Sequence, residues 1–280
     1  MTRPTRLATG DMTGERPKVT TATLRTMKAQ HERITALTAY DHLFAELLDQ
    51  AGIDVLLVGD SVATVMQGRD TTVPVTMDQM VYHCELVGRA TKRALLVCDM
   101  PFLSYQVSIE DALRNAGRLL KEGLAEAVKL EGGLAFAPTV QRLVDAGIPV
   151  MGHLGLTPQS IHQFGSYKVR GQEAPEQRRI VDDAKALEQA GAFALVLEKV
   201  PAKLGARVAK AVKIPVIGIC AGPDVDGQIL VTHDLLGLFT RFRPRFARRY
   251  LELADEIGKA VQSYCKDVRG GSFPNESESY

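Results

Sequence analysis

Acidic side chains stand at the ends of three short apolar runs in this sequence. Asp60, Asp99 and Glu131 each lie one or two residues past such a run. Burial of several carboxylates at one place raises their pKa values by mutual repulsion unless a cation lies among them. Oxygen ligands without a cluster of His or Cys favour a hard ion, so we predict that these three side chains bind Mg²⁺ rather than Zn²⁺. The alternative for any single one of them is a capping bond to the following helix.

Three further polar residues end or follow apolar runs. Glu198 stands two strands beyond the acidic trio and is predicted to be a general base, although a rim ion pair with its neighbour Lys199 is an alternative. Lys129 lies two residues before Glu131, so both side chains point to one face of a strand, and its ammonium group could hold a substrate carboxylate. His153 follows the fifth run, where a structural and a functional role are both open.

The elements that must position these residues alternate between strands and helices. Leu43, Leu47 and Leu48, for example, have helical spacing. Near-continuous apolar runs are typical of parallel strands, and eight strand and helix repeats indicate a single-domain (βα)8 TIM barrel of the α/β class, whose working residues end the strands. A doubly wound open sheet is the alternative, but no glycine-rich turn follows the first strand. The predicted strands are 34–38, 55–58, 94–98, 127–130, 149–151, 194–197 and 215–219, with 229–232 proposed as the eighth.

Size and charge restrict the class of protein. The chain has 280 residues, of which 45% are hydrophobic, and this length suits one barrel. A formal net charge of +1 gives no field that favours nucleic acid or an acidic membrane surface, so we expect a small-molecule partner. The apolar runs are too short to span a membrane, and no apolar signal core follows Met1. Four cysteines that form no C-x-x-C pair suit reduced thiols in the cytoplasm.

The chain divides into three predicted parts. Residues 1–20 are expected to form a flexible N-terminal tail, with a weak transit peptide as the alternative. Residues 21–268 form the catalytic barrel, which a helix over 243–266 closes, and residues 269–280 form a C-terminal tail. The segment 157–171 is the longest stretch between a strand and the next clear helix, and we predict that it is a lid at the active face.

Several segments, in this order and spacing, resemble motifs of the ketopantoate hydroxymethyltransferase family. The resemblance spans most of the chain. No single motif is decisive, and the specificity lies in the whole series. The segments are LTAYD (37–41), LVGDS (57–61), TVPV (72–75), DMPF (99–102), VKLEGG (128–133), GHLGLTPQS (152–160), LEKVP (197–201) and DGQIL (226–230).

This resemblance implies an enzyme that transfers a one-carbon unit from 5,10-methylenetetrahydrofolate to 3-methyl-2-oxobutanoate and yields 2-dehydropantoate for pantothenate synthesis. It implies a large homo-oligomer, commonly a decamer, in the cytoplasm. The 2-oxo acid would chelate Mg²⁺, which stabilises the enolate formed when C3 loses its proton. The implied metal ligands are Asp60, Asp99 and Glu131, the implied substrate contacts are Asp60, Ser61, Asp99 and Lys129, to which we add His153, and Glu198 is the implied proton acceptor.

Two departures from the family pattern and two rival functions stay open. Cys220 stands where the family has the middle glycine of G-I-G-A-G, which puts the affinity for folate in doubt, and the chain ends Ser277-Glu278-Ser279-Tyr280 where a histidine-containing tail is common. One rival is a lyase or mutase of the phosphoenolpyruvate mutase and isocitrate lyase kind, although the K-K-C-G-H loop of the lyases is missing. The other is an oligomeric barrel without turnover.

Overall fold

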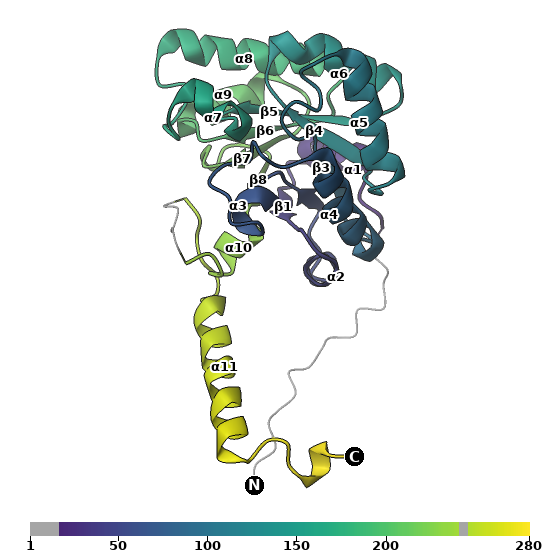
Figure 1. Ribbon diagram of the computed structural model, residues 1–280. Coiled ribbons are helices and arrows are strands. Elements are labelled where there is room, and N and C mark those ends of the chain that lie inside the picture. The colour runs from purple at the N-terminus through teal and green to yellow at the C-terminus, as the bar shows by residue number, and fades with distance from the viewer. Residues whose placement is uncertain (1–16, 241–245) are drawn as a thin grey trace.

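Eight parallel strands close into a barrel, which confirms the predicted fold class. The computed structural model describes residues 17–240 and 246–280 (Figure 1). Each strand pairs with the next along the chain, and β8 pairs with β1, with Ile34 opposite Gly227. The eighth strand begins two residues before its predicted start. The strands are β1 Ile34–Thr38, β2 Val55–Val58, β3 Leu95–Asp99, β4 Ala127–Glu131, β5 Val150–Gly155, β6 Ala194–Glu198, β7 Val216–Ile219 and β8 Gly227–Leu230.

Helices cover most of the outside of the barrel (Figure 1). Several begin at a side chain that accepts a hydrogen bond from the first turn, such as Thr20 before α1, Thr76 before α4 and Ser108 before α5. None of the described helices combines the length and apolar composition that a membrane crossing requires. The helices are α1 Thr21–Ala29, α2 His42–Gln50, α3 Val62–Val65, α4 Met77–Ala90, α5 Ile109–Lys121, α6 Ala137–Asp145, α7 Ile161–Phe164, α8 Ala174–Gln189, α9 Ala202–Ala211, α10 Thr232–Leu235 and α11 Leu253–Gly270, with 3-10 turns at Leu134–Phe136, Pro158–Ser160 and Glu276–Glu278.

Successive strand residues alternate between two hydrophobic cores. In β4, Val128 and Leu130 pack in the cluster between the strands and the helices, whereas Ala127 belongs to the cluster inside the barrel. Because side chains two residues apart share a face of a strand, Lys129 and Glu131 point inward with Ala127. The period of two in the sequence therefore decides which polar side chains enter the barrel.

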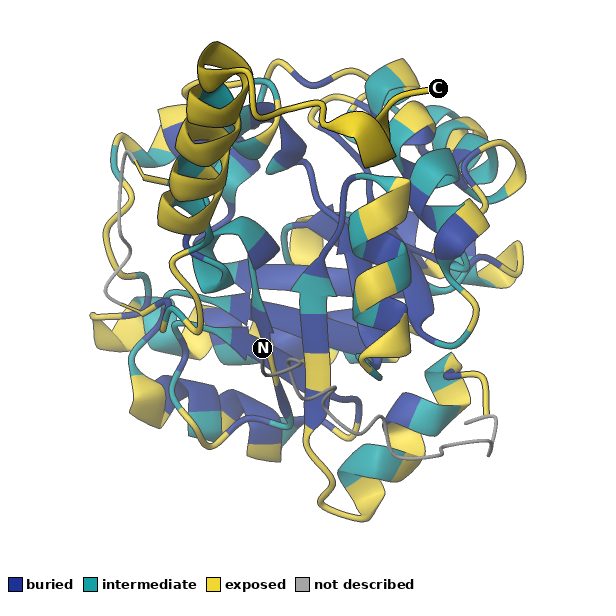
Figure 2. Cartoon of the chain, turned by 90° about the horizontal axis from the view of Figure 1, so that it is seen from below, coloured by how far each residue is buried: buried dark blue, intermediate teal, exposed yellow. Residues whose placement is uncertain are grey.

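The outer face near β8 departs from the helix-covered pattern. Residues 220–226 join β7 to β8 without a helix, and Thr35 and Gln228 are exposed on the adjoining strands. The predicted helix over 243–266 exists from Leu253 onward, but the prediction that it closes the barrel is wrong. Helix α11 begins at Leu253, has no buried residue and extends away from the barrel, and Figure 2 shows most of it in the exposed colour. Residues 243–245 lie outside the described residues.

The predicted N-terminal tail is partly packed against the barrel. Val19 is buried, and its backbone N–H donates to the carbonyl oxygen of Arg93. Lys18 Nζ donates to the carbonyl oxygen of Ala94 and lies 2.7 Å from Glu126 Oε2. Residues 17–20 are thus held in place just before α1, while the prediction for residues 1–16 lies outside the described part of the chain.

Candidate active site

All seven residues predicted at the site line one cavity at the carboxyl end of the barrel. The cavity has a volume of about 170 Å³. Its walls also include apolar residues of the barrel mouth such as Leu57, Val196 and Ile229. Catalytic residues in (βα)8 barrels come from this end of the strands. The predicted residues at the cavity are Asp60, Ser61, Asp99, Lys129, Glu131, His153 and Glu198.

Strand register explains why these side chains meet. In the sheet Asp99 lies beside Lys129, and Glu131 lies beside His153. Glu198 ends β6 and lies beside Gly155 of β5. Residues at equal height on neighbouring strands of a closed barrel converge on its axis, so charges that are far apart in sequence become direct neighbours.

A buried ion pair joins Lys129 and Asp99. Lys129 Nζ lies 2.9 Å from Asp99 Oδ1, and the two side chains are 4% and 5% exposed. The other oxygen, Asp99 Oδ2, accepts the backbone N–H of Asp60 at 3.0 Å. Asp99 Oδ1 has no further hydrogen-bond partner among the described residues. One lysine therefore neutralises one carboxylate of the trio, and each oxygen of Asp99 has one described partner, which leaves a lone pair on each for a further contact.

His153 lies between two carboxylates. Its Nδ1 atom is 3.3 Å from Glu131 Oε1, and its Nε2 atom is 3.3 Å from Glu198 Oε2. Lys129 Nζ is 3.1 Å from the same Nδ1 atom. Burial and the charge of Lys129 lower the pKa of His153, but its contacts with the two carboxylates outweigh them and raise the pKa to about 9. His153 can therefore hold a proton beside Glu198 at neutral pH.

The alternatives for single acidic residues are not realised. Ser61, rather than Asp60, precedes α3, and Ser108 caps α5, the helix that follows Asp99. No ion pair joins Glu198 to Lys199 in the part of the chain that the structure describes, and Glu198 instead lies beside His153. Each of these carboxylates faces the cavity.

Crowding of buried negative charge raises the pKa values of two aspartates. Burial, followed by the charges of Asp99 and Glu131, raises the pKa of Asp60 to about 7. Burial also raises the pKa of Asp99, although Lys129 opposes this. Burial alone lowers the pKa of Lys129, but the surrounding carboxylates outweigh burial and raise it. The cavity thus holds more negative charge than its own lysine and histidine balance.

This excess of negative charge indicates whether the cavity suits a divalent cation. Among the described residues, no three His, Cys, Asp or Glu side chains come together as a ready set of metal ligands. Mg²⁺, however, needs only one or two carboxylates and takes its other ligands from water and substrate. Buried carboxylates with raised pKa values, whose oxygens keep lone pairs beyond their present contacts, fit a hard cation of this kind.

Gln159 and Tyr105 belong to the site although sequence reasoning did not single them out. Gln159 Nε2 donates to Asp60 Oδ2 at 2.9 Å, and the backbone N–H of Gln159 donates to Glu131 Oε2 at 3.0 Å. The Tyr105 hydroxyl donates to Gln159 Oε1 at 2.8 Å. The segment GHLGLTPQS contains Gln159, so its family resemblance was a usable signal. No comparable signal marked Tyr105, which lies in an irregular loop after β3.

Cys220 stands in a backbone conformation that favours glycine. Its φ angle is 53°, in the left-handed region, and its side chain is half-buried. It lines a separate cleft of about 640 Å³ with Arg33, Gln228 and Arg248. All four cysteines are free thiols, as their spacing predicted.

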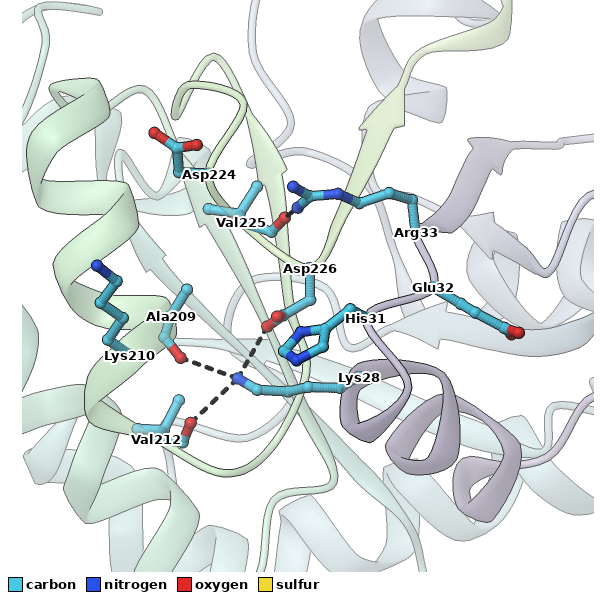
Figure 3. A pocket seen from close by; sticks show the side chains of 10 residues that line it. All are labelled: Lys28, His31, Glu32, Arg33, Ala209, Lys210, Val212, Asp224, Val225 and Asp226. Atoms are coloured by element: carbon cyan, nitrogen blue, oxygen red, sulfur yellow. Dashed lines mark hydrogen bonds and ion pairs between the residues drawn. The ribbon is translucent and has the colours of Figure 1, made fainter.

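A further cleft of about 430 Å³ lies at the amino ends of the strands (Figure 3). There Lys28 Nζ donates to the carbonyl oxygens of Ala209 and Val212 and lies 2.9 Å from Asp226 Oδ2. These contacts compensate carbonyl groups at the end of α9 that have no helical partner. Lys28 thus fixes α1 to the amino-terminal end of the barrel. We interpret this cleft as a structural contact between α1 and the barrel.

Solved structures of low sequence identity share this fold. A putative phosphonomutase from Burkholderia cenocepacia superposes with a TM-score of 0.63 at 15% identity, covering 86% of this chain and 98% of that one. A phosphonopyruvate hydrolase in complex with oxalate and Mg²⁺ superposes with a TM-score of 0.61 at 15% identity, covering 93% of both chains. At this level of identity, the similarity shows a shared barrel fold and gives no evidence for an activity of this chain.

Sequence identity is much higher to a group of hydroxymethyltransferases than to these solved structures. The 3-methyl-2-oxobutanoate hydroxymethyltransferase of Prosthecochloris aestuarii is 58% identical over 268 residues, which are 94% of this chain and 97% of the relative. The enzyme of that name from Moorella thermoacetica is 55% identical, covering 95% and 99% of the two chains. The ketopantoate hydroxymethyltransferase family profile matches residues 18–276. With this match over nearly its whole length, the chain belongs to the ketopantoate hydroxymethyltransferase family.

Proposed function

We propose that this enzyme transfers a hydroxymethyl group from 5,10-methylenetetrahydrofolate to 3-methyl-2-oxobutanoate and forms 2-dehydropantoate in pantothenate biosynthesis. The observation that carries the proposal is the convergence of all seven expected residues on one small, largely buried cavity. Relatives of 55% to 58% identity that bear the name of this enzyme support the choice of substrate. The solved structures that share this fold are only about 15% identical to this chain, so their similarity does not support a mutase or lyase function.

Asp60, Asp99 and Glu131 are the residues that we propose to hold Mg²⁺. All three are buried at one side of the cavity, and they carry more negative charge than Lys129 neutralises. Bound there, Mg²⁺ supplies stabilisation of the negative charge that develops on the keto oxygen of the substrate. Exclusion of bulk water from the cavity strengthens this electrostatic effect.

The substrate carboxylate is the group that we assign to Lys129. Its ammonium group is buried and stays charged, because the surrounding carboxylates raise its pKa. Ser61 Oγ lies 2.8 Å from Tyr40 Oη, a contact that restrains the rotamer of the serine at the cavity wall, where we assign it a contact with the substrate. His153 lies between Lys129 and Glu198 and completes the polar wall.

Glu198 is the proposed acceptor of the C3 proton. It ends β6, which is opposite β2 and Asp60 in a ring of eight strands, so a substrate bound at β2 to β4 presents its far side to Glu198. With a side chain that is 20% exposed, Glu198 is more accessible than the metal-binding acids. After Glu198 takes the proton, C3 forms a bond to the methylene carbon of the folate as one of the two carbon–nitrogen bonds of that methylene group breaks. Water then supplies the hydroxyl group as the second carbon–nitrogen bond breaks, and the proton held by Glu198 and one proton of the water go to the two nitrogens of the departing tetrahydrofolate.

A turnover assay tests this proposal directly. The purified protein is incubated with 3-methyl-2-oxobutanoate and 5,10-methylenetetrahydrofolate, with Mg²⁺ or with a chelator, and 2-dehydropantoate is measured by mass spectrometry. We expect product only when both substrates and the divalent ion are present. Absence of product with every divalent metal tested would contradict the proposed function and favour a barrel without this turnover.

Assembly and location complete the proposal. We propose a cytoplasmic homo-oligomer, with a decamer as the expected size. Exposed apolar side chains on α11, namely Ile257, Val261, Tyr264 and Val268, support a contact between subunits. Light scattering after size-exclusion chromatography measures the mass of the assembly, and a monomeric mass at micromolar concentration contradicts it.

A further inference from the structure

We propose that Gln159 is a positioning residue of the active site, which holds Asp60 in the orientation that a divalent cation and the 2-oxo acid require. This inference rests on the proposed function. Gln159 lies in the loop after β5, whereas Asp60 follows β2, so the contact crosses the mouth of the barrel. The side chain touches no reacting atom, and it acts through the carboxylate of Asp60.

The amide of Gln159 uses its full hydrogen-bonding capacity. Its Nε2 atom donates to Asp60 Oδ2 and to the carbonyl oxygen of Met100, both at 2.9 Å. Its Oε1 atom accepts from the Tyr105 hydroxyl at 2.8 Å and from Gln106 Nε2 at 3.3 Å. Two donated and two accepted bonds are all that a primary amide can form. A residue that is only 5% exposed is thus fully satisfied by protein groups.

These partners also fix which way the amide points. A rotation by 180° would place Gln159 Oε1 against Asp60 Oδ2 and the carbonyl oxygen of Met100, which are both acceptors. The Tyr105 hydroxyl accepts the backbone N–H of Glu131 at 3.1 Å. Two acceptors lie within reach of its single proton, and Gln159 Oε1 at 2.8 Å is nearer than the carbonyl oxygen of Glu131 at 3.1 Å. A directional chain therefore runs from Glu131 through Tyr105 and Gln159 to Asp60.

Amide chemistry suits this role better than a charged group. A lysine at position 159 would neutralise Asp60, and a glutamate would add repulsion, whereas an amide orients the carboxylate and leaves its charge available to a cation. The backbone N–H of Gln159 binds Glu131 Oε2 as well, so one residue contacts two of the three acids proposed to hold the metal. The position of the loop after β5 and the orientation of Asp60 are thereby linked.

The test compares two variants with a matched control. Gln159→Met has a similar length without hydrogen bonds, and it keeps the backbone bond to Glu131. Tyr105→Phe removes the hydroxyl that donates to the amide and that also accepts the Glu131 N–H. Gln141→Met serves as the control, because Gln141 Nε2 also donates to an aspartate, Asp145 Oδ1 at 2.8 Å, but on the exposed surface of α6. Circular dichroism verifies that each variant is folded.

Three quantities are measured, namely Mg²⁺ binding by calorimetry in the presence of 3-methyl-2-oxobutanoate, KM for the oxo acid and kcat. We expect Gln159→Met to weaken Mg²⁺ binding and raise KM by about tenfold or more, as loss of a hydrogen bond to a charged group predicts, with a smaller change in kcat. Tyr105→Phe should change them in the same direction by a smaller factor, and Gln141→Met should match the wild type.

Separate outcomes identify which idea fails. Wild-type protein that binds no Mg²⁺ and forms no product contradicts the proposed function. Wild-type protein that works, together with folded Gln159→Met and Tyr105→Phe variants of unchanged Mg²⁺ affinity and KM, overturns the positioning role. Lower thermal stability with unchanged Mg²⁺ affinity in these variants likewise assigns Gln159 a purely structural role and overturns the inference.

Discussion

Removal of one partner from the ion pair between Lys129 and Asp99 should be strongly destabilising, because it leaves an uncompensated charge where almost no water reaches. The atoms lie 2.9 Å apart and the side chains are 4% and 5% exposed. Lys129→Met removes the cation and leaves the charge of Asp99 buried without a counter-charge, although the Asp60 N–H still donates to it. This change is expected to lower the free energy of unfolding by about 3 to 5 kcal/mol in metal-free buffer. Urea unfolding of both proteins with a chelator present measures the difference.

The loss should depend on pH in a defined direction. Burial already raises the pKa of Asp99, and removal of Lys129 removes the main opposing charge. In the variant the folded state therefore binds a proton that the unfolded chain releases above about pH 4, so its stability falls as pH rises. The difference from the wild type should be smaller at about pH 5.5 than at about pH 8, because protonation relieves the unpaired charge.

A second lysine provides the control for this measurement. Lys18 forms an ion pair of similar length, 2.7 Å, with Glu126, but both side chains are more than a third exposed. Lys18→Met should cost only about 1 kcal/mol or less. If Lys129→Met costs no more than Lys18→Met, or if its cost does not change with pH, the description of Asp99 as a buried and compensated charge is refuted.

Three further predictions test the site. Glu198→Gln should abolish deuterium exchange at C3 of 3-methyl-2-oxobutanoate, followed by NMR, while Mg²⁺-dependent binding of the oxo acid persists; undiminished exchange removes Glu198 from the base role. Asp99→Ala should weaken that binding by about tenfold or more in calorimetry, and unchanged binding would argue against Asp99 as a ligand. Cys220→Gly should raise the free energy of unfolding by about 1 kcal/mol. A φ angle of 53° costs a residue with a Cβ atom more free energy than glycine loses through its larger chain entropy in the unfolded state. Lower stability in urea would contradict this, and KM for the folate shows whether Cys220 also affects that substrate.

Charge placement inside the barrel could be predicted from the sequence because it depends on local periodicity. A spacing of two between Lys129 and Glu131 put both on one face, and the end of each apolar run located Asp60, Asp99 and Glu198 at the rim. Prediction of the contact between His153 and Glu198 also requires the register of β5 with β6. The sequence of a single strand does not contain this register.

Contacts made by irregular segments could not be predicted in the same way. Gln159 reaches Asp60 only because the loop after β5 folds back over the mouth, and no periodic pattern encodes that path. The error at α11 has a related cause. Apolar spacing indicated a helix near the C-terminus, but spacing alone does not say which surface a helix packs against, and none of the described surface of this chain buries it.

The alternation along β4 has a consequence for how this protein can change in evolution. A one-residue insertion or deletion within 127–131 would reverse the faces of the strand, turning Lys129 and Glu131 toward the helices and Val128 and Leu130 into the barrel. Such a change would destroy the hydrophobic packing and the site together. Length variation in this enzyme should therefore be tolerated in exposed connections and rejected in the strands, so that selection for folding also preserves the chemistry.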